Sequence, residues 1–176
     1  MHEFNPKATV ADTQLQRLSG RINRVVEYLA ATFLILLSLA AMLQVLTRHV
    51  LDFSFVWTEE LSRFSFIWCS FLGASVLTYH GGHATLDFLH DRLHGRSRAY
   101  HSLLVEVIVF LIASCLVIFS IPLVTITYQQ LSPALQIPMA CVYSAVMVTG
   151  ALIAFHSLAR GQAALRSIKS QKKAGE

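Results

Sequence analysis

Four long apolar stretches dominate the pattern of hydrophobic and polar positions along the 176-residue chain. A helix rises about 1.5 Å per residue, so about 20 residues cross a bilayer core about 30 Å thick. Backbone polar groups find no water in lipid, and an α-helix satisfies them internally. The pattern therefore predicts an all-α membrane protein with four transmembrane helices, at about 25–47, 61–79, 104–127 and 137–159.

Composition agrees with a membrane protein. Hydrophobic residues make up 55% of the chain and charged residues 14%, against about 25% charged residues in soluble domains. A soluble helical protein needs a polar face on each helix. Residues 107–126 and 137–155 contain no charged residue from which to build one.

The basic residues predict the orientation of the spans. Twelve of the fourteen Lys and Arg residues precede the first span, lie between the second and third, or follow the fourth. Arg48 and Arg63 fall on the opposite side. The positive-inside rule then places both termini in the cytoplasm. We interpret the basic charge as a sign of topology and anionic lipid contact, and expect no nucleic-acid partner.

The segments outside the spans complete the expected organisation. Residues 1–20 are expected to be a flexible cytoplasmic N-terminus, residues 21–162 the membrane domain, and residues 163–176 a basic cytoplasmic tail. We expect short amphipathic interfacial helices near 48–60 and 83–98. The first apolar run is longer than the 7–15 residues or so of a signal-peptide core, which favours a retained anchor.

Charged residues mark the entry to the second span. Thr58 is placed to cap a helix, and Glu59 and Glu60 fall in its first turn. Arg63 follows them at a spacing that allows pairing along one face, and an unpaired arginine entering lipid is costly. Two interpretations stay open: an ion pair that anchors the helix at the interface, or a polar contact to another membrane subunit.

The second span has two kinds of side chain at helical spacing. Its small residues, which favour close helix packing, are Ser62, Ser65, Cys69 and Gly73. Its large residues are Trp57, Leu61, Phe64, Trp68 and Phe71. Trp68 lies too deep for an interfacial belt. It faces lipid, fills the bundle or docks onto a partner, and the sequence does not choose among the three.

Histidines raise two cofactor hypotheses. His90 and His94 have the spacing of metal ligands on one helix turn, but no cysteine is near them and we expect no metal. His80 and His156 fall near the same ends of their spans, as bis-histidine haem would require. A haem-binding, cytochrome b-like membrane anchor of a redox complex is therefore the alternative function. The sequence has no phosphate loop and no nucleophile with a base, so we expect no catalytic or substrate-binding residue.

Three sequence blocks carry a resemblance to a known family. The first runs from Trp57-Thr58-Glu59-Glu60-Leu61-Ser62-Arg63 through Trp68 to Gly73 and Ala74. The second is residues 83–93, with His83 and Asp87, and the third is residues 132–138, followed by Tyr143 and Gly150. Over about 24–160 the chain resembles the DctQ family, the small membrane subunits of tripartite ATP-independent periplasmic (TRAP) transporters. It departs from the family at His94 and at Met147 and Val148, where many members have proline.

The resemblance implies a small, non-catalytic subunit of a sodium-coupled secondary transporter that imports an organic acid across the bacterial inner membrane. A large multi-span membrane subunit would carry the substrate and sodium sites, and a periplasmic binding protein would deliver the substrate. This chain would brace the large subunit among membrane lipids, without a cofactor. The expected interface or structural residues are Trp57, Glu59, Glu60, Arg63, Trp68, Gly73, Ala74, His83, Asp87, Ser132, Pro133, Pro138 and Tyr143.

Overall fold

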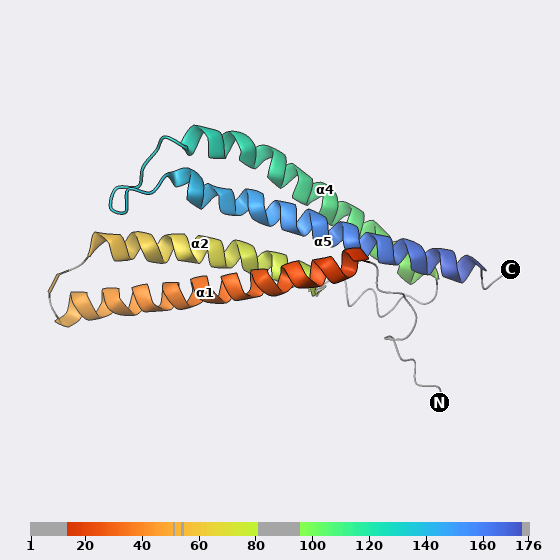
Figure 1. Cartoon of the computed structure of the whole chain (residues 1–176), viewed down its shortest axis with the longest axis horizontal. Coiled ribbons are helices and arrows are strands. Elements are labelled where there is room, and N and C mark those ends of the chain that lie inside the picture. Colours follow the sequence, from red (N-terminus) through yellow and green to blue (C-terminus); the bar gives the residue numbers. More distant parts are fainter. Residues whose placement is uncertain (1–13, 51, 54, 81–95, 174–176) are drawn as a thin grey trace, which may run out of the picture.

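The computed structural model describes residues 14–50, 52–53, 55–80 and 96–173, and four long helices joined by short connections make up most of them (Figure 1). The helices are α1 (Gln14–Val50), α2 (Val56–Tyr79), α4 (Arg96–Thr127) and α5 (Met139–Lys173). All four contain a segment long and apolar enough to cross a membrane. The prediction of an all-α fold with four candidate spans is confirmed.

The helices form a single layer in the order α1, α2, α5, α4 (Figure 1). Helix α1 packs on α2, α2 packs on α5, and α5 packs on α4, and the start of α1 also contacts α5, while α4 packs on neither α1 nor α2. Two antiparallel hairpins are therefore joined through α2 and α5. We call the end that carries the start of α1 and the last turns of α5 the terminal end, and the opposite end the loop end.

Two of the helices extend well beyond the apolar runs. Helix α1 begins at Gln14 and α5 continues to Lys173, so parts of the segments predicted to be a flexible N-terminus and a tail are helical. Hydropathy marks only the part of a helix that lies in lipid. The polar extensions are rich in Gln, Arg, Lys and Leu, which are good helix formers in water.

Among the described residues of 48–60, no separate interfacial helix is formed. Helix α1 continues through Arg48 to Val50, and α2 already begins at Val56, so a short connection replaces the separate helix. In that connection Asp52 has a φ of 52°, the left-handed conformation typical of a tight turn. Residues 81–95 lie outside the described residues, and they include most of the second predicted interfacial helix.

Small residues bring α4 and α5 close together. Ala113 of α4 and Ala145 of α5 are fully buried between the helices. A Cβ atom added to Gly150 would lie 2.9 Å from Cγ2 of Val117 and 3.2 Å from the carbonyl oxygen of Ala113. Only glycine fits at that point, and such close approach strengthens helix packing in lipid.

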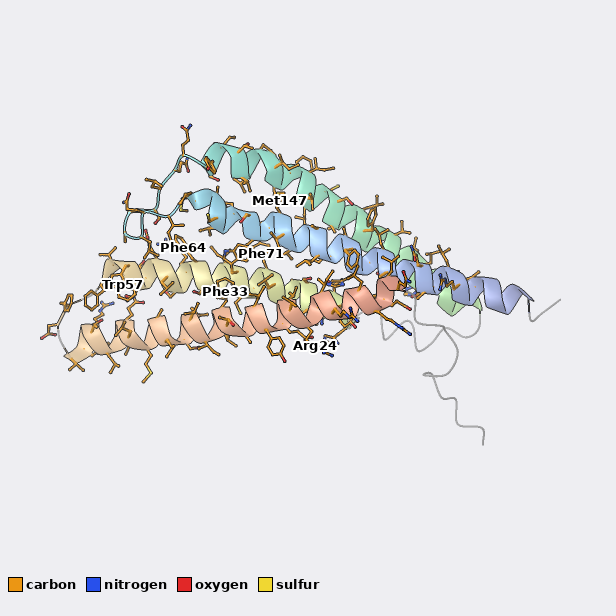
Figure 2. The ribbon with its side chains drawn as sticks, in the orientation of Figure 1. Arg24, Phe33, Trp57, Phe64, Phe71 and Met147 are labelled. Atoms are coloured by element: carbon orange, nitrogen blue, oxygen red, sulfur yellow. The ribbon has the colours of Figure 1, made fainter. Side chains whose placement is uncertain are left out.

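An aromatic stack joins α1 to α2. The rings of Phe33 and Trp68 lie 5.6 Å apart between centroids and are inclined by 13°. Figure 2 shows Phe33 on the side of α1 that faces α2. Trp68 thus packs partly within the chain, and the rest of its half-buried side chain is open to the surroundings.

Much of the apolar surface of the layer faces outward (Figure 2). Tyr28, Phe119 and Ile126 are each more than 70% exposed, and many other large apolar side chains are exposed as well. Contiguous apolar surface of this extent marks contact with a membrane or a partner. The fold therefore buries little of its hydrophobic surface within the chain itself.

Candidate functional site

Glu60 of α2 ties the loop end of the layer together. Its side chain is buried, and its two carboxylate oxygens accept hydrogen bonds from the backbone N–H groups of Ala134 (3.2 Å) and Leu135 (2.9 Å). The Ser132 side chain is a third hydrogen-bond partner of the carboxylate. Bonds to an ionised acceptor are stronger than neutral ones, and they satisfy donors in a loop that has no helix of its own.

The loop at 132–138 is built to present those N–H groups. Its ends are joined by the Ser132 N–H, which donates to the Ile137 carbonyl at 2.9 Å. Gln136 adopts a φ of 53°, and its side-chain amide donates to the carbonyl oxygens of Ser132 and Pro133. Helix α5 starts directly after Pro138, at Met139.

A cavity of about 270 Å³ lies beside this clamp, between α2 and α5. It brings together four residues that the sequence analysis singled out in separate blocks: Glu60, Arg63, Pro133 and Tyr143. Apolar side chains complete its lining, namely Phe64, Ile67, Met139 and Val142. A charged group at the edge of an apolar hollow is a typical place for one polar contact to a neighbouring molecule.

Arg63 forms no direct ion pair with either preceding glutamate, but its charge still interacts favourably with Glu60. Glu60 binds the loop, and no ion pair of Arg63 is found among the described residues. Arg63 is exposed, and so is Glu59. The spacing of Glu60 and Arg63 does place them near each other on α2. The N–H groups of the loop, from a distant part of the sequence, nevertheless take the hydrogen-bonding positions of the Glu60 carboxylate.

Thr58 also plays another role than the one predicted. Helix α2 starts at Val56, with Phe55 at the N-cap position and no side-chain cap. The Thr58 hydroxyl donates to the Phe55 carbonyl at 2.7 Å, and the side chain is fully buried. Trp57, by contrast, is 39% exposed near Phe55.

The remaining predicted interface residues do not join this cavity. A Cβ atom added to Gly73 would meet nothing within 4 Å, and Ala74 is exposed, so this face of α2 is open, whereas the neighbouring Leu72 and Ser75 are buried. His83 and Asp87 lie outside the described residues, as do His90 and His94.

The terminal end holds a second polar cluster that sequence reasoning missed. Arg160 of α5 pairs through Nε with Oε1 of Glu106 at 2.8 Å, and donates through Nη1 to the Thr78 carbonyl at 2.7 Å. The Ser157 hydroxyl lies 2.9 Å from Oε2 of Glu106. This cluster joins α2, α4 and α5. The sequence did contain a signal for this cluster, because Glu106 and Arg160 lie at the ends of two consecutive spans that meet on the same side of the membrane.

Histidines of this end bind separate partners. His156 is fully buried, and its Nδ1 lies 2.7 Å from the Ser19 hydroxyl of α1. His80 is exposed, and its Nε2 lies 2.9 Å from the Glu27 carboxylate. The bis-histidine arrangement considered from the sequence is not formed, because His80 binds an acid while His156 is enclosed beside Tyr79. Among the described residues, no three acidic, His or Cys side chains are grouped to hold a metal.

The geometry thus defines a membrane protein whose polar residues hold helices and loops together, with an exposed arginine beside a small cavity. Comparison with known proteins is specific. The family described as "Tripartite ATP-independent periplasmic transporters, DctQ component" matches residues 37–166, most of the chain. The chain belongs to this family.

Three relatives illustrate the similarity. A putative TRAP transporter small permease protein of Haemophilus influenzae is 24% identical over 79% of this chain and 86% of its own length. The isethionate TRAP transporter permease protein DctMQ of Oleidesulfovibrio alaskensis is 35% identical over 58% of this chain. The sialic acid TRAP transporter permease protein SiaT of Haemophilus influenzae is 30% identical over 56% of this chain. The chain matches only 16% and 15% of the lengths of the last two proteins.

Proposed function

We propose that this chain is the small, non-catalytic membrane subunit of a TRAP transporter and acts as a scaffold for a large membrane subunit. Family membership supports the transporter assignment. The layer of four helices supports the scaffold role, because it offers broad apolar faces to a partner. The polar residues described above mostly bind one another at the two ends of the layer, as in a brace.

Arg63 and the cavity beside it are the observation on which the interface proposal rests. Glu60 is hydrogen-bonded to the loop, and Arg63 forms no direct ion pair with a described residue, although its charge also acts on the Glu60 carboxylate. An exposed arginine on a membrane helix is stabilised by an acidic or carbonyl group of a neighbour. We place the contact with the large subunit on α2 and α5 at the loop end, continuing along α2 to the open surface at Gly73.

The class of transported compound and the other partners are proposed from the family. A relative matched over 86% of its length is named as a small permease protein, which supports a separate large subunit as the partner of this chain. That large subunit would carry the sodium and organic-acid sites, and a periplasmic binding protein would supply the acid. The basic terminal end would face the cytoplasm of a bacterium, with the protein in the inner membrane.

Replacement of Arg63 tests the proposed interface. The tagged chain is purified from its own membranes in mild detergent, and the amount of co-purified large subunit is measured by mass spectrometry. We expect Arg63→Ala to lower that amount at least threefold, and Arg63→Lys to restore part of it. Arg48→Ala is the matched control, because Arg48 is also an exposed arginine at the loop end.

Uptake of labelled isethionate and sialic acid into cells, with and without a sodium gradient, tests the function. Sodium-dependent uptake of either acid that requires this chain would support the proposal. Normal partner recovery and uptake for Arg63→Ala, at matched expression, would refute the interface. Recovery of the wild-type chain with soluble redox subunits in place of a large membrane protein would refute the scaffold role.

A further inference from the structure

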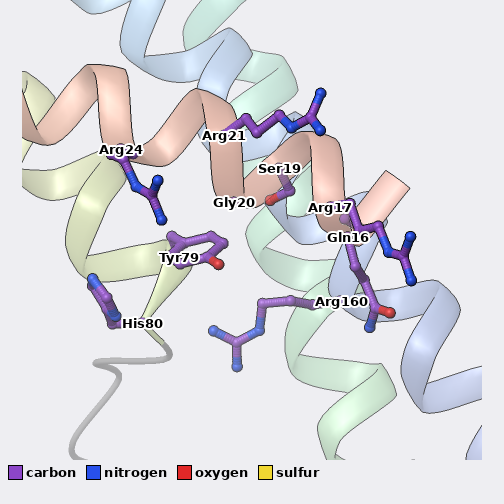
Figure 3. A pocket seen from close by; sticks show the side chains of 10 residues that line it. Gln16, Arg17, Ser19, Gly20, Arg21, Arg24, Tyr79, His80 and Arg160 are labelled. Atoms are coloured by element: carbon purple, nitrogen blue, oxygen red, sulfur yellow. The ribbon is translucent and has the colours of Figure 1, made fainter. Parts of the chain in front are cut away.

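A basic cavity of about 780 Å³ opens at the terminal end, between the first turns of α1, the end of α2 and α5 (Figure 3). Four arginines and one histidine line it: Arg17, Arg21, Arg24, Arg160 and His80. The Tyr79 side chain projects into it as well (Figure 3). No acidic side chain is among its described lining residues.

The acids nearest to the cavity already have partners. Glu106 accepts hydrogen bonds from Arg160 and Ser157, and Glu27 accepts them from His80 and Asn23. Arg21 and Arg24 are both exposed, and neither forms an ion pair with a described residue. The cavity therefore keeps an excess of positive charge after the internal pairs are formed. Its chemistry suits a phosphate group, which arginine binds through several N–H groups.

The basic residues continue into an apolar stripe on the same face of α1. Residues at intervals of three, four and seven share a face of a helix. Arg17, Arg21 and Arg24 are followed at these intervals by exposed side chains that change from aromatic to aliphatic: Tyr28 (71% exposed), Ile35 (59%), Leu39 (60%) and Met42 (63%). The order along the stripe is that of a phospholipid, with phosphate first, then the interfacial region where tyrosine is favoured, then acyl chain.

We propose that the cavity and the stripe bind one anionic phospholipid. Arg21 and Arg24 would donate to its phosphate, with the Tyr79 hydroxyl as a neutral donor, and an acyl chain would lie along Ile35 and Leu39. The apolar side chains that continue the stripe favour a lipid over a free phosphate ion, because only a lipid has an acyl chain to contact them. The proposal does not depend on the transporter role, since it rests only on the described residues of α1, α2 and α5.

Native mass spectrometry of the full chain tests the proposal directly. The protein is purified in mild detergent, and phosphatidylglycerol or phosphatidylcholine with the same acyl chains is added. We expect one phosphatidylglycerol to be retained at least tenfold more strongly than phosphatidylcholine. Inorganic phosphate at millimolar concentration should not displace it. Equal retention of the two lipids would overturn the proposal, and so would displacement by phosphate, which would indicate an ion site.

Variants then locate the site. Arg24→Gln is compared with Arg48→Gln, the same change at the other end of the same helix, and with the double variant Arg21→Gln/Arg24→Gln. We expect the double variant to lose at least tenfold in retention of phosphatidylglycerol, and Arg48→Gln to lose less than twofold. Equal losses at both ends of α1 would mean a general effect of charge and would refute the site. The wild-type comparison of the two lipids still decides if the double variant does not fold.

Discussion

The N–H of Leu135 donates a 2.9 Å hydrogen bond to Oε2 of Glu60, a residue 75 positions earlier in the chain. The neighbouring N–H of Ala134 binds the other carboxylate oxygen. A single buried side chain therefore ties the second turn of α2 to the connection between α4 and α5. This contact is one of the few polar links between the two hairpins at the loop end, and its loss should be measurable.

We expect Glu60→Ala to destabilise the chain by about 1–3 kcal/mol, because two backbone N–H groups lose a buried acceptor. Glu60→Gln should cost less, since its carbonyl oxygen retains one of the two bonds. Thermal unfolding in detergent, followed by circular dichroism, measures the effect. Glu59→Ala is the control, because Glu59 immediately precedes Glu60 in the sequence and its side chain is exposed. Equal stability of the Glu59 and Glu60 variants would contradict the clamp.

The partly buried Glu106–Arg160 pair gives a second prediction. Removing one partner of a fully buried ion pair costs about 3–5 kcal/mol, and we expect a smaller loss here because the Arg160 side chain is 36% exposed and screened by solvent. Glu106→Gln and Arg160→Gln should each destabilise the fold. The double variant should be less destabilised than the sum of the two. Strict additivity in this double-mutant cycle would show that the two side chains do not interact.

Two glycines should respond differently to the same change, because only one of them lacks room for a methyl group. Gly150→Ala places a methyl group 2.9 Å from Val117 and 3.2 Å from the Ala113 carbonyl, so we expect a loss of about 1–3 kcal/mol. Gly73→Ala meets open space and should leave the stability of the chain unchanged. Both are measured by thermal unfolding of the purified chain. A stable Gly73 variant that recovers less of the large subunit would extend the interface along α2.

The Phe33–Trp68 stack can be followed by fluorescence. The chain has two tryptophans, so Trp57→Phe leaves Trp68 as the only one. In that background we expect Phe33→Ala to increase quenching of Trp68 by lipids with brominated acyl chains, because the ring loses its cover on α1. Phe66→Ala removes an exposed ring of α2 and is the control. No difference between the two variants would place Trp68 away from Phe33.

Hydropathy was sufficient to predict the four helices, since the energetics of backbone groups in lipid leave few alternatives. It could not predict where α1 begins or where α5 ends. The first turns of α1, from Gln14, and the last turns of α5, to Lys173, lie in polar sequence. Nor could it predict the order of helices in the layer. Lipid and helix surfaces are equally apolar, so the contacts depend on small residues such as Gly150 and on the fit at each position.

The site shows the same division between local and distant information. The spacing of Glu60 and Arg63 predicted a pair on one helix, and the residues are indeed near one another beside the same cavity. The Glu60 carboxylate nevertheless binds backbone N–H groups of a loop that is far away in sequence. Rules on residue spacing within one helix cannot predict such a distant hydrogen-bond donor. Ser132, Pro133 and Tyr143 were singled out only by the family resemblance, and the fold brings them to the same end as Glu60.

The arrangement of α1, α2, α5 and α4 side by side has one further consequence. A partition one helix thick separates two sides without surrounding anything. The described helices do not close into a ring, because α4 packs on neither α1 nor α2. A solute passing along this protein would therefore be separated from lipid on one side only. The opposite flank of any such passage would have to be built by another molecule.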